Sequence, residues 1–328
     1  MVSTIPSFVT SCSKETSSKL DVVYEGKYLL WAAKEFDITE DHIVSATFEG
    51  KTVTDEFDIS FKTSSNGLKI NSQRVDDKGY KFTIDKGSDE GNYEFEICIS
   101  YKDEISYSKT FYVTVCNFIP LNNFTIDNAG CATVSEDAFG NYDGIYIPDK
   151  IDGKTVTTFS IPGQSHPNIK TLAFDCESEV TYLGMYAIQG LFNLETVEIP
   201  AKLQGVKEYS IATVPNSNDS VTKIKKVIFD NVNFPRIFSK DAFLMGYRID
   251  GTNPDLKEFV FNNLNNLQPF DTDDQYYRAF RTSYNESGTV TLINCGFDIE
   301  TAKAFMEKPN RSLFNTGSDK TKWTYIEK

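Results

Sequence analysis

The side chains that could carry out chemistry are few and scattered. The chain has two histidines, His42 and His166, which removes most options for general-base catalysis near neutral pH and for imidazole ligation of a metal. His42 lies in a polar segment before Ile43 and His166 in a turn-like stretch before Pro167, so we expect both at the surface. The six cysteines are Cys12, Cys98, Cys116, Cys131, Cys176 and Cys295. No two of them stand at a CxxC-like spacing, and six are sparse for a disulfide-stapled scaffold of this length. We therefore expect no zinc site and mostly free, buried thiols.

Acidic residues give the next candidates. Asp271, Asp273 and Asp274 form a cluster that could bind Ca²⁺, but no EF-hand spacing with a downstream glutamate follows, and loop carboxylates are usually only solvated. A glycosidase pair of carboxylates cannot be found by spacing along the chain, because only its separation in the fold matters, and no pair stands out. We therefore expect no enzyme activity, no cofactor, and no catalytic, cofactor-binding or metal-binding residues.

Length and charge limit the class of protein further. The 328 residues are enough for two domains, and the apolar content of 40% is typical of globular proteins. The net charge of −14 repels nucleic acid and anionic lipid headgroups, so neither is an expected partner. The sequence contains no apolar run of about 18 residues, as a membrane-spanning helix requires.

Residues 1–19 are expected to form a flexible leader. The segment from Val9 to Lys14 resembles the end of a bacterial lipoprotein signal, in which a small residue precedes the cysteine that is acylated. The residues before it depart from that pattern, since they include Pro6, lack a basic region and form only a short apolar stretch. Two readings stay open: Cys12 is a lipidation site, or it is an ordinary cysteine in a Ser/Thr-rich tether.

Residues 20–116 have the pattern of a β-sandwich. Phe57, Ile59 and Phe61 alternate with polar residues, and the same period of two recurs at 80–84, 93–99 and 111–115. About seven short strands separated by Asn/Asp/Gly turns are typical of a sandwich. The stretch from Asp89 to Tyr93 resembles the D-x-G-x-Y turn of immunoglobulin-like domains, in which the tyrosine hydroxyl ties back the corner before a late strand.

The cysteines of this part are not expected to pair with each other. Phe95 stands where antibody-type domains have the inter-sheet cysteine, so apolar packing would replace that disulfide. If a hairpin turns near residues 102–104, the cross-strand partner of Cys98 is residue 107 or 108, which comes well before Cys116 in the chain.

Residues 117–328 contain a repeated pattern of apolar residues at i, i+3 and i+5. The six candidate rungs are Tyr142/Ile145/Ile147, Ile169/Leu172/Phe174, Leu194/Val197/Ile199, Ile224/Val227/Phe229, Leu256/Phe259/Phe261 and a degraded Ser287/Val290/Leu292. Residues two apart on a strand point to one face, so the second and third members should face the interior of a stacked coil. Stacking makes that interior continuous, which predicts a solenoid.

Three features accompany these rungs. Ile147-Pro148 and Ile199-Pro200 end two of them, a DGKxV stretch lies at 152–156, and a small-then-large apolar pair recurs at 138–139, 187–188, 242–243 and 279–280. Together they closely resemble the BspA-like leucine-rich repeat family. The later rungs depart from it, because Phe229 and Phe261 precede Asp230 and Asn262 instead of proline. The resemblance implies a bacterial cell-surface or secreted protein.

The expected fold class is thus mainly β: an immunoglobulin-like β-sandwich followed by a BspA-like leucine-rich repeat solenoid with a short C-terminal helix. That helix is predicted at 298–307 with Asp298 as its N-cap, where it would cover the open end of the repeats.

The candidate binding face is the column at i+4 of each rung, which points away from the solenoid interior. We expect Tyr146, Glu198, Ile228, Val260 and Thr291 to form this face, and Ala173 lies in the same column. Ile228 and Val260 would form an exposed apolar strip on adjacent rungs, of the kind that often marks a contact site, unless an inserted loop covers it.

The resemblance therefore implies an adhesin-like, non-catalytic protein that binds a host or cell-surface protein through its repeats. Its location would be extracellular or at the cell surface, with membrane contact only through a lipid anchor in the outer membrane. Two alternatives remain: a surface lipoprotein that binds or helps process carbohydrate, suggested by the aromatic content of 13%, and a structural spacer.

Overall fold

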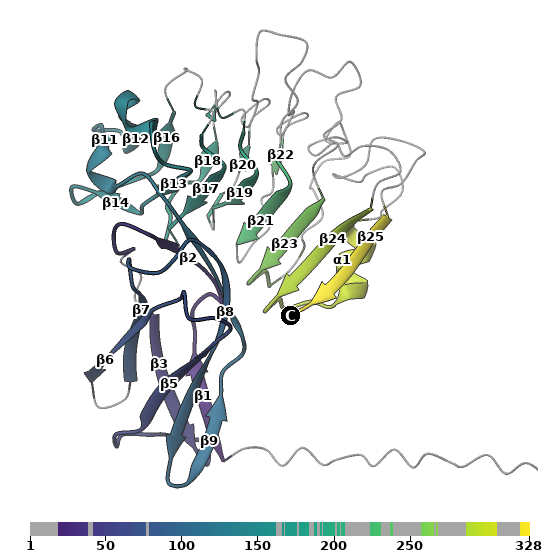
Figure 1. The fold of residues 1–328 in the computed structure, drawn as a ribbon. Helices are drawn as coiled ribbons and strands as arrows, with labels where there is room; N and C mark the ends of the chain where they lie inside the picture. Colours follow the sequence, from purple (N-terminus) through teal and green to yellow (C-terminus); the bar gives the residue numbers. More distant parts are fainter. Residues whose placement is uncertain are drawn as a thin grey trace, which may run out of the picture.

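A computed structural model describes residues 19–328 except 39–41, 77–78, 162–165, 167, 176, 184–186, 189–190, 192, 201, 204, 207–223, 231–236, 239–256, 266, 268–286 and 307–321. The chain is mainly β, with two five-stranded sheets in the N-terminal part and a β-solenoid of about three turns in the C-terminal part (Figure 1). Cys12, Cys176 and the cluster at Asp271, Asp273 and Asp274 lie outside the described residues.

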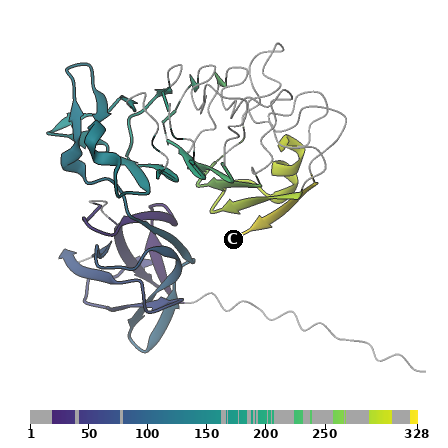
Figure 2. The same ribbon diagram turned by 45° about the horizontal axis from the view of Figure 1, so that its top comes forward.

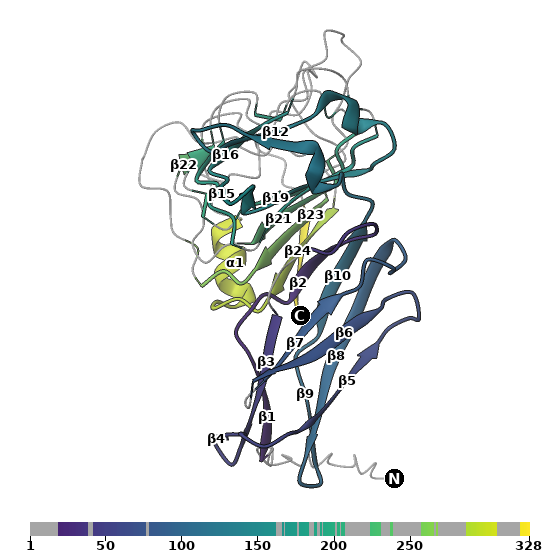
Figure 3. The same cartoon turned by 90° about the vertical axis from the view of Figure 1, so that its left-hand side faces the viewer.

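The N-terminal part, from Leu20 to Cys116, consists of two sheets around one core; we call it the two-sheet unit (Figure 3). The first sheet has the order β1 (Leu20–Tyr24), β3 (His42–Phe48), β7 (Gly79–Ile84) and β6 (Ile70–Asp76), with β4 (Lys51–Thr52) beside β3. The second sheet has the order β2 (Leu29–Ala33), β10 (Phe111–Cys116), β8 (Gly91–Tyr101) and β5 (Asp58–Thr63), with β9 (Glu104–Tyr107) beside β8.

The alternation of apolar and polar residues explains why these segments are strands. Phe82, Phe95 and Phe111 all point inward and are buried, and the rings of Phe95 and Phe111 stack with centroids 4.7 Å apart. The segments predicted as strands at 57–61, 80–84, 93–99 and 111–115 correspond to β5, β7, β8 and β10. None of these segments extends more than one residue beyond its strand. The period of two therefore located these elements correctly.

Two local predictions in this unit are confirmed. The β8–β9 hairpin turns at Lys102 and Asp103, which both have positive φ, and it places Cys98 opposite Tyr107, so Cys98 and Cys116 are free thiols. The hydroxyl of Tyr93 donates a hydrogen bond of 2.9 Å to the carbonyl oxygen of Asp89, as expected for the D-x-G-x-Y stretch.

The solenoid is built on one seven-stranded parallel sheet. Its strands are, in spatial and sequence order, β13 (Gly144–Ile147), β17 (Thr171–Phe174), β19 (Thr196–Ile199), β21 (Lys226–Asp230), β23 (Glu258–Asn262), β24 (Ser287–Ile293) and β25 (Lys322–Glu327). The first six carry the predicted rungs, and the i+3 and i+5 residues of all six belong to one buried core, as expected. β25 is a seventh strand that the repeat pattern did not reveal, because it has Trp323 and Tyr325 where most other rungs have aliphatic residues or phenylalanine.

Short elements complete the coils. The opposite wall contains β18 (Tyr182–Leu183), β20 (Gly205–Val206) and β22 (Ile237–Phe238), which pair in parallel. The N-terminal end holds the 3₁₀ turns η1 (Leu121–Asn123) and η2 (Glu136–Phe139) and a sheet of β11 (Phe124–Ile126), β12 (Cys131–Val134) and β16 (Thr158–Ser160).

The motifs that suggested the repeat have clear structural roles. Pro148 and Pro200 directly follow the ends of β13 and β19. The DGKxV stretch forms a hairpin between β14 (Lys150–Ile151) and β15 (Lys154–Thr155), whose turn residues Asp152 and Gly153 have φ of 51° and 77°. This two-residue turn is the type that favours Asp-Gly. Of the small-then-large pairs, Ala138-Phe139 and Ile188 are buried in the core, and the pairs at 242–243 and 279–280 lie outside the described residues.

The predicted C-terminal helix is confirmed as α1 (Ile299–Met306). The backbone N–H of Thr301 donates a 2.8 Å hydrogen bond to Oδ1 of Asp298, which is therefore the N-cap. Ala302 and the partly buried Phe305 pack against the solenoid core.

We expect Asp298→Ala to lower the free energy of unfolding by about 1 kcal/mol, because the cap hydrogen bond is lost. The measurement is a urea titration. Ser135→Ala is the matched control, since Ser135 precedes η2 without a side-chain cap bond, and it should change stability by less than about 0.5 kcal/mol. Equal effects of the two variants would contradict the capping role of Asp298.

Candidate functional site

The two parts of the chain meet along the outer face of the solenoid sheet. All five residues of β2 are buried, although β2 is an edge strand of its sheet. The register with β10 places Leu29, Trp31 and Ala33 on the outer side of the second sheet, away from the core between the two sheets. These residues belong to one apolar cluster with the outer column of the solenoid, so the solenoid covers this face. We call the contact the joint.

The prediction that the i+4 column is exposed to solvent is wrong. Its members point away from the solenoid interior as predicted, but each is at most 5% exposed. The exposures are Tyr146 1%, Ala173 0%, Glu198 2%, Ile228 1%, Val260 1% and Thr291 5%. The cover is the two-sheet unit, which packs on this column in place of the inserted loop weighed as the alternative. The apolar strip at Ile228 and Val260 is thus the inner surface of the joint.

The connection between the two parts is short and hydrogen-bonded. The N–H of Asn117 donates to Oδ1 of Asp143, and the N–H of Asp143 donates to the carbonyl oxygen of Asn117, both at 3.1 Å. Phe118 then forms a parallel bridge with Gly144 in β13, and its ring lies 6.1 Å from that of Trp31. The chain therefore passes from β10 into the first coil without a free linker, which restricts hinge motion between the parts.

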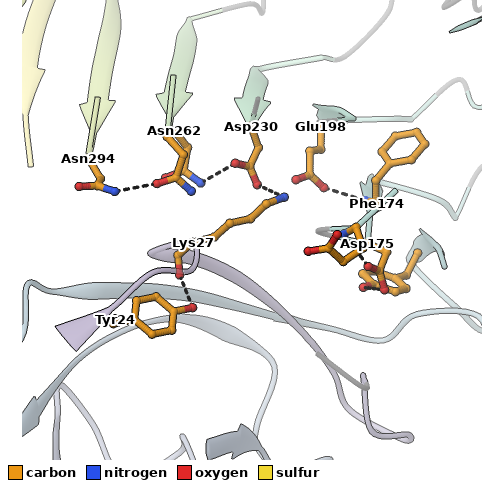
Figure 4. Close-up of polar contacts among 11 residues, drawn as sticks. Tyr24, Lys27, Phe174, Asp175, Glu198, Asp230, Asn262 and Asn294 are labelled. Atoms are coloured by element: carbon orange, nitrogen blue, oxygen red, sulfur yellow. Dashed lines mark hydrogen bonds and ion pairs between the residues drawn. The ribbon is translucent and has the colours of Figure 1, made fainter. Parts of the chain in front are cut away.

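A strip of buried and partly buried polar groups runs along the joint (Figure 4). Nζ of Lys27, in the turn before β2, lies 2.6 Å from Oδ2 of Asp230 at the end of β21. Nδ2 of Asn262, at the same position of β23, donates 3.0 Å to Oδ1 of Asp230. One rung further, Nδ2 of Asn294 donates 2.9 Å to Oδ1 of Asn263. The ion pair is buried, since the Lys27 and Asp230 side chains are 17% and 2% exposed.

Two further carboxylates lie on the same face of the sheet. The hydroxyl of Tyr146 donates 3.0 Å to Oδ2 of Asp175, and the N–H of Glu177 donates 2.8 Å to Oδ1. Oε2 of Glu198 accepts a 2.7 Å hydrogen bond from the N–H of Phe174. Burial raises the pKa of Asp175, and the two hydrogen bonds only partly oppose that effect. These acceptors are thus occupied by groups of the chain itself.

Comparisons of the chain with protein family models, with curated proteins and with solved structures gave no match. Among the described residues, no group of three or more His, Cys, Asp and Glu side chains is placed to hold a metal ion. In the same part of the chain, no helix has the length and apolar character needed to cross a bilayer.

Both histidines were expected at the surface, and this is wrong. His42 is stacked on Phe82 at 4.9 Å, and His166 on Phe139 at 3.6 Å; both are buried. The Tyr24 hydroxyl donates to the carbonyl oxygen of Lys27 at 2.9 Å, so it accepts from Nδ1 of His42, 3.1 Å away. His42 and Tyr24 thereby fix the turn that carries Lys27.

The thiols of Cys116 and Cys295 are poorly suited to nucleophilic chemistry. Burial raises the pKa of Cys116 to about 12, and its Sγ lies 3.9 Å from Oγ1 of Thr171 across the joint. Burial likewise raises the pKa of Cys295 to about 11. A thiol with such a pKa carries almost no thiolate near neutral pH. Cys98, Cys116, Cys131 and Cys295 are free; Cys116 is buried as expected and the other three are only partly buried.

Lys27, Asp230 and Asn262 were missed as a set by reasoning from sequence. One signal was present, because Asp230 and Asn262 replace the proline that ends earlier rungs. At that position a side chain can extend past the strand end and reach a neighbouring rung or the two-sheet unit. Nothing in the sequence marked Lys27, which lies in an ordinary turn.

The raised pKa of Asp175 gives a pH prediction. The folded protein holds the Asp175 proton more tightly than the unfolded chain, so this group's contribution to stability increases as pH falls through the folded-state pKa and stops changing below the unfolded value of about 3.9. Asp175→Asn removes that titration. We expect the stability of the wild type, relative to this variant, to rise as pH falls from neutrality toward the unfolded-state pKa. Urea titrations at several pH values test this, and a difference that is flat or falls on acidification would contradict it.

Proposed function

We propose that this chain is a non-catalytic, adhesin-like surface protein that presents one rigid binding body to a host or cell-surface protein. The observation that carries the proposal is the joint, in which an apolar column of the solenoid, the outer face of β2 and the Lys27–Asp230 ion pair are buried together. An immunoglobulin-like two-sheet unit would be the spacer, and BspA-like repeats would form the rest of the body. Acylation at Cys12 would attach it to the outer membrane.

A rigid joint favours binding over catalysis. A receptor whose two parts are already fixed relative to each other loses less conformational entropy when it binds a large ligand. Contacts on both parts can therefore add to the affinity. The buried carboxylates are held by Lys27, Asn262, Tyr146 and backbone N–H groups, and reactive chemistry would require at least some of them to be available.

The test is a binding screen with the whole chain on arrays of extracellular-matrix proteins and of glycans. The whole chain is needed because separating the two parts would expose Ile228 and Val260 and create artificial binding. Saturable binding to a protein supports the proposal. Binding to glycans alone would replace it with the carbohydrate-binding alternative, and absence of binding on both arrays would favour a structural spacer.

A further inference from the structure

Lys27 and Asp230 belong to different parts of the chain and meet inside the joint. Lys27 lies in the turn before β2 of the two-sheet unit, Asp230 ends β21 of the solenoid, and the two parts lie against each other in Figure 2. Nζ of Lys27 is 2.6 Å from Oδ2 of Asp230, and the two side chains are 17% and 2% exposed. An amine and a carboxyl group are therefore held in contact at a place with little access to water.

The surroundings make the ionised form of this pair costly. Ile228 and Val260 lie two residues before Asp230 and Asn262 on the same face of the sheet, in the apolar cluster that also contains β2. In such surroundings both charges lose solvation, and the attraction between them offsets that loss only in part. A neutral bond between the two groups would remove the cost.

Both groups are positioned before any reaction. The Tyr24 hydroxyl donates a 2.9 Å hydrogen bond to the carbonyl oxygen of Lys27, which fixes the turn from which the lysine extends. Asp230 is in register with Asn262 of β23, whose Nδ2 donates a 3.0 Å hydrogen bond to Oδ1 of Asp230. One carboxyl oxygen is thus held by an amide, and the other faces the amine. Holding two reactants in contact raises their effective concentration by orders of magnitude.

We infer that Lys27 and Asp230 condense to an isopeptide bond that joins the two parts of the chain covalently. A proton passes from the ammonium group to Oδ2, and the neutral amine of Lys27 attacks Cγ of Asp230. The Nζ–Cγ bond forms and the Cγ–Oδ2 bond breaks, so that Oδ2 leaves as water with a second proton from Nζ. The pair supplies every atom of this reaction, and the ion pair of the structure is the state before it.

Asn262 assists the step through the other carboxyl oxygen. Negative charge develops on Oδ1 of Asp230 when the amine adds to Cγ, and Nδ2 of Asn262 already donates to that atom. Oδ1 then becomes the carbonyl oxygen of the new amide and keeps the same hydrogen bond. The released water has a short way out, because the Lys27 side chain is 17% exposed and the pair borders solvent.

The inference goes beyond the proposed function, because the bond forms whether or not a partner binds. Its effect is to close the joint covalently. A link between positions 27 and 230 reduces the conformational entropy of the unfolded chain, as a disulfide does when it closes a long loop. Loss of the link would add to the destabilisation caused by the charge that remains when Lys27 is replaced.

The test is the mass of the full chain after purification, incubation at neutral pH and denaturation. We expect a mass that is one water below the sum of its residues. Trypsin does not cleave after an acylated lysine, so digestion should give residues 20–34 as one peptide, joined to the peptide 227–236. Lys225 and Glu195 are the internal control, because their ion pair of 2.9 Å lies at the surface and should give no link.

Two variants separate the chemistry from the fold. Lys27→Arg keeps a cation beside Asp230, but its guanidinium group stays protonated and does not attack, so the variant should have the full mass of its residues. Asn262→Leu has a side chain of similar size without the donor to Oδ1, so the link should form at least about tenfold more slowly. Urea unfolding shows whether each variant is folded, and the wild-type mass decides the inference even if one is not.

The contrary outcomes are distinct. A wild-type mass equal to the sum of its residues after prolonged incubation would overturn the inference. Loss of ammonia in place of water would assign the bond to Asn262, and loss of water within a single tryptic peptide would indicate an aspartyl succinimide; either result would exclude Asp230 as the acceptor. A link that forms equally fast in Asn262→Leu would contradict the role of Asn262 at Oδ1.

Discussion

Replacing Ile228 with aspartate is expected to lower the free energy of unfolding by about 3–5 kcal/mol, the range for an unpaired charge placed in a core. Ile228 lies in the middle of the outer column, 1% exposed, and packs in the same cluster as the residues of β2. The new carboxylate either stays buried at this cost or reaches water by opening the joint. Urea unfolding measures the cost, and small-angle X-ray scattering reports opening as an increase in radius of gyration.

The same column supplies the control. Ile326 occupies the equivalent position on β25 but is 39% exposed, so Ile326→Asp should change the free energy of unfolding by less than about 0.5 kcal/mol. If both variants behaved alike, with small losses and unchanged scattering, the two-sheet unit would not cover Ile228 in solution.

The repeats could be predicted because they are local. Residues i+3 and i+5 of a rung, such as Val227 and Phe229, point to the same side of a strand whatever surrounds it, and the interior they face is made by their own copies on neighbouring rungs. The Asp298 cap and the pairing of Cys98 with Tyr107 follow from equally local rules of helix starts and hairpin turns.

The candidate site could not be predicted, because it depends on packing between segments far apart in the chain. Period two shows that Ile228 points away from the solenoid interior, but only the docking of β2 decides whether that side meets water. The apolar character of Ile228 and Val260 is typical of a patch for an external partner. The same character is what an internal joint requires, and sequence alone does not distinguish the two.

The histidines illustrate the same limit. His42 precedes Ile43 in a strand, and one residue of register decides which of them is buried. In the structure His42 faces Phe82 and Tyr24, while Ile43 is exposed. The polar neighbours of His42 in the sequence therefore led to a wrong prediction, because a hydrogen bond to the Tyr24 hydroxyl and stacking on Phe82 offset the burial of its ring.

Lys27→Met is expected to lower the free energy of unfolding by about 3–5 kcal/mol, because it leaves the Asp230 carboxylate buried without its cation. Lys225→Met is the matched control, since Lys225 pairs with Glu195 at 2.9 Å on the exposed surface, and it should cost less than about 1 kcal/mol. Urea titration of both variants gives the comparison.

The double variant Lys27→Met with Asp230→Asn separates two explanations of that loss. If the loss reflects an uncompensated charge, the neutral amide removes it, and the double variant should be more stable than Lys27→Met alone by about 2 kcal/mol or more. If Lys27 instead contributed mainly through its aliphatic packing, the second substitution would restore nothing. A restored double variant with an unchanged radius of gyration would show that the joint stays closed without the ion pair.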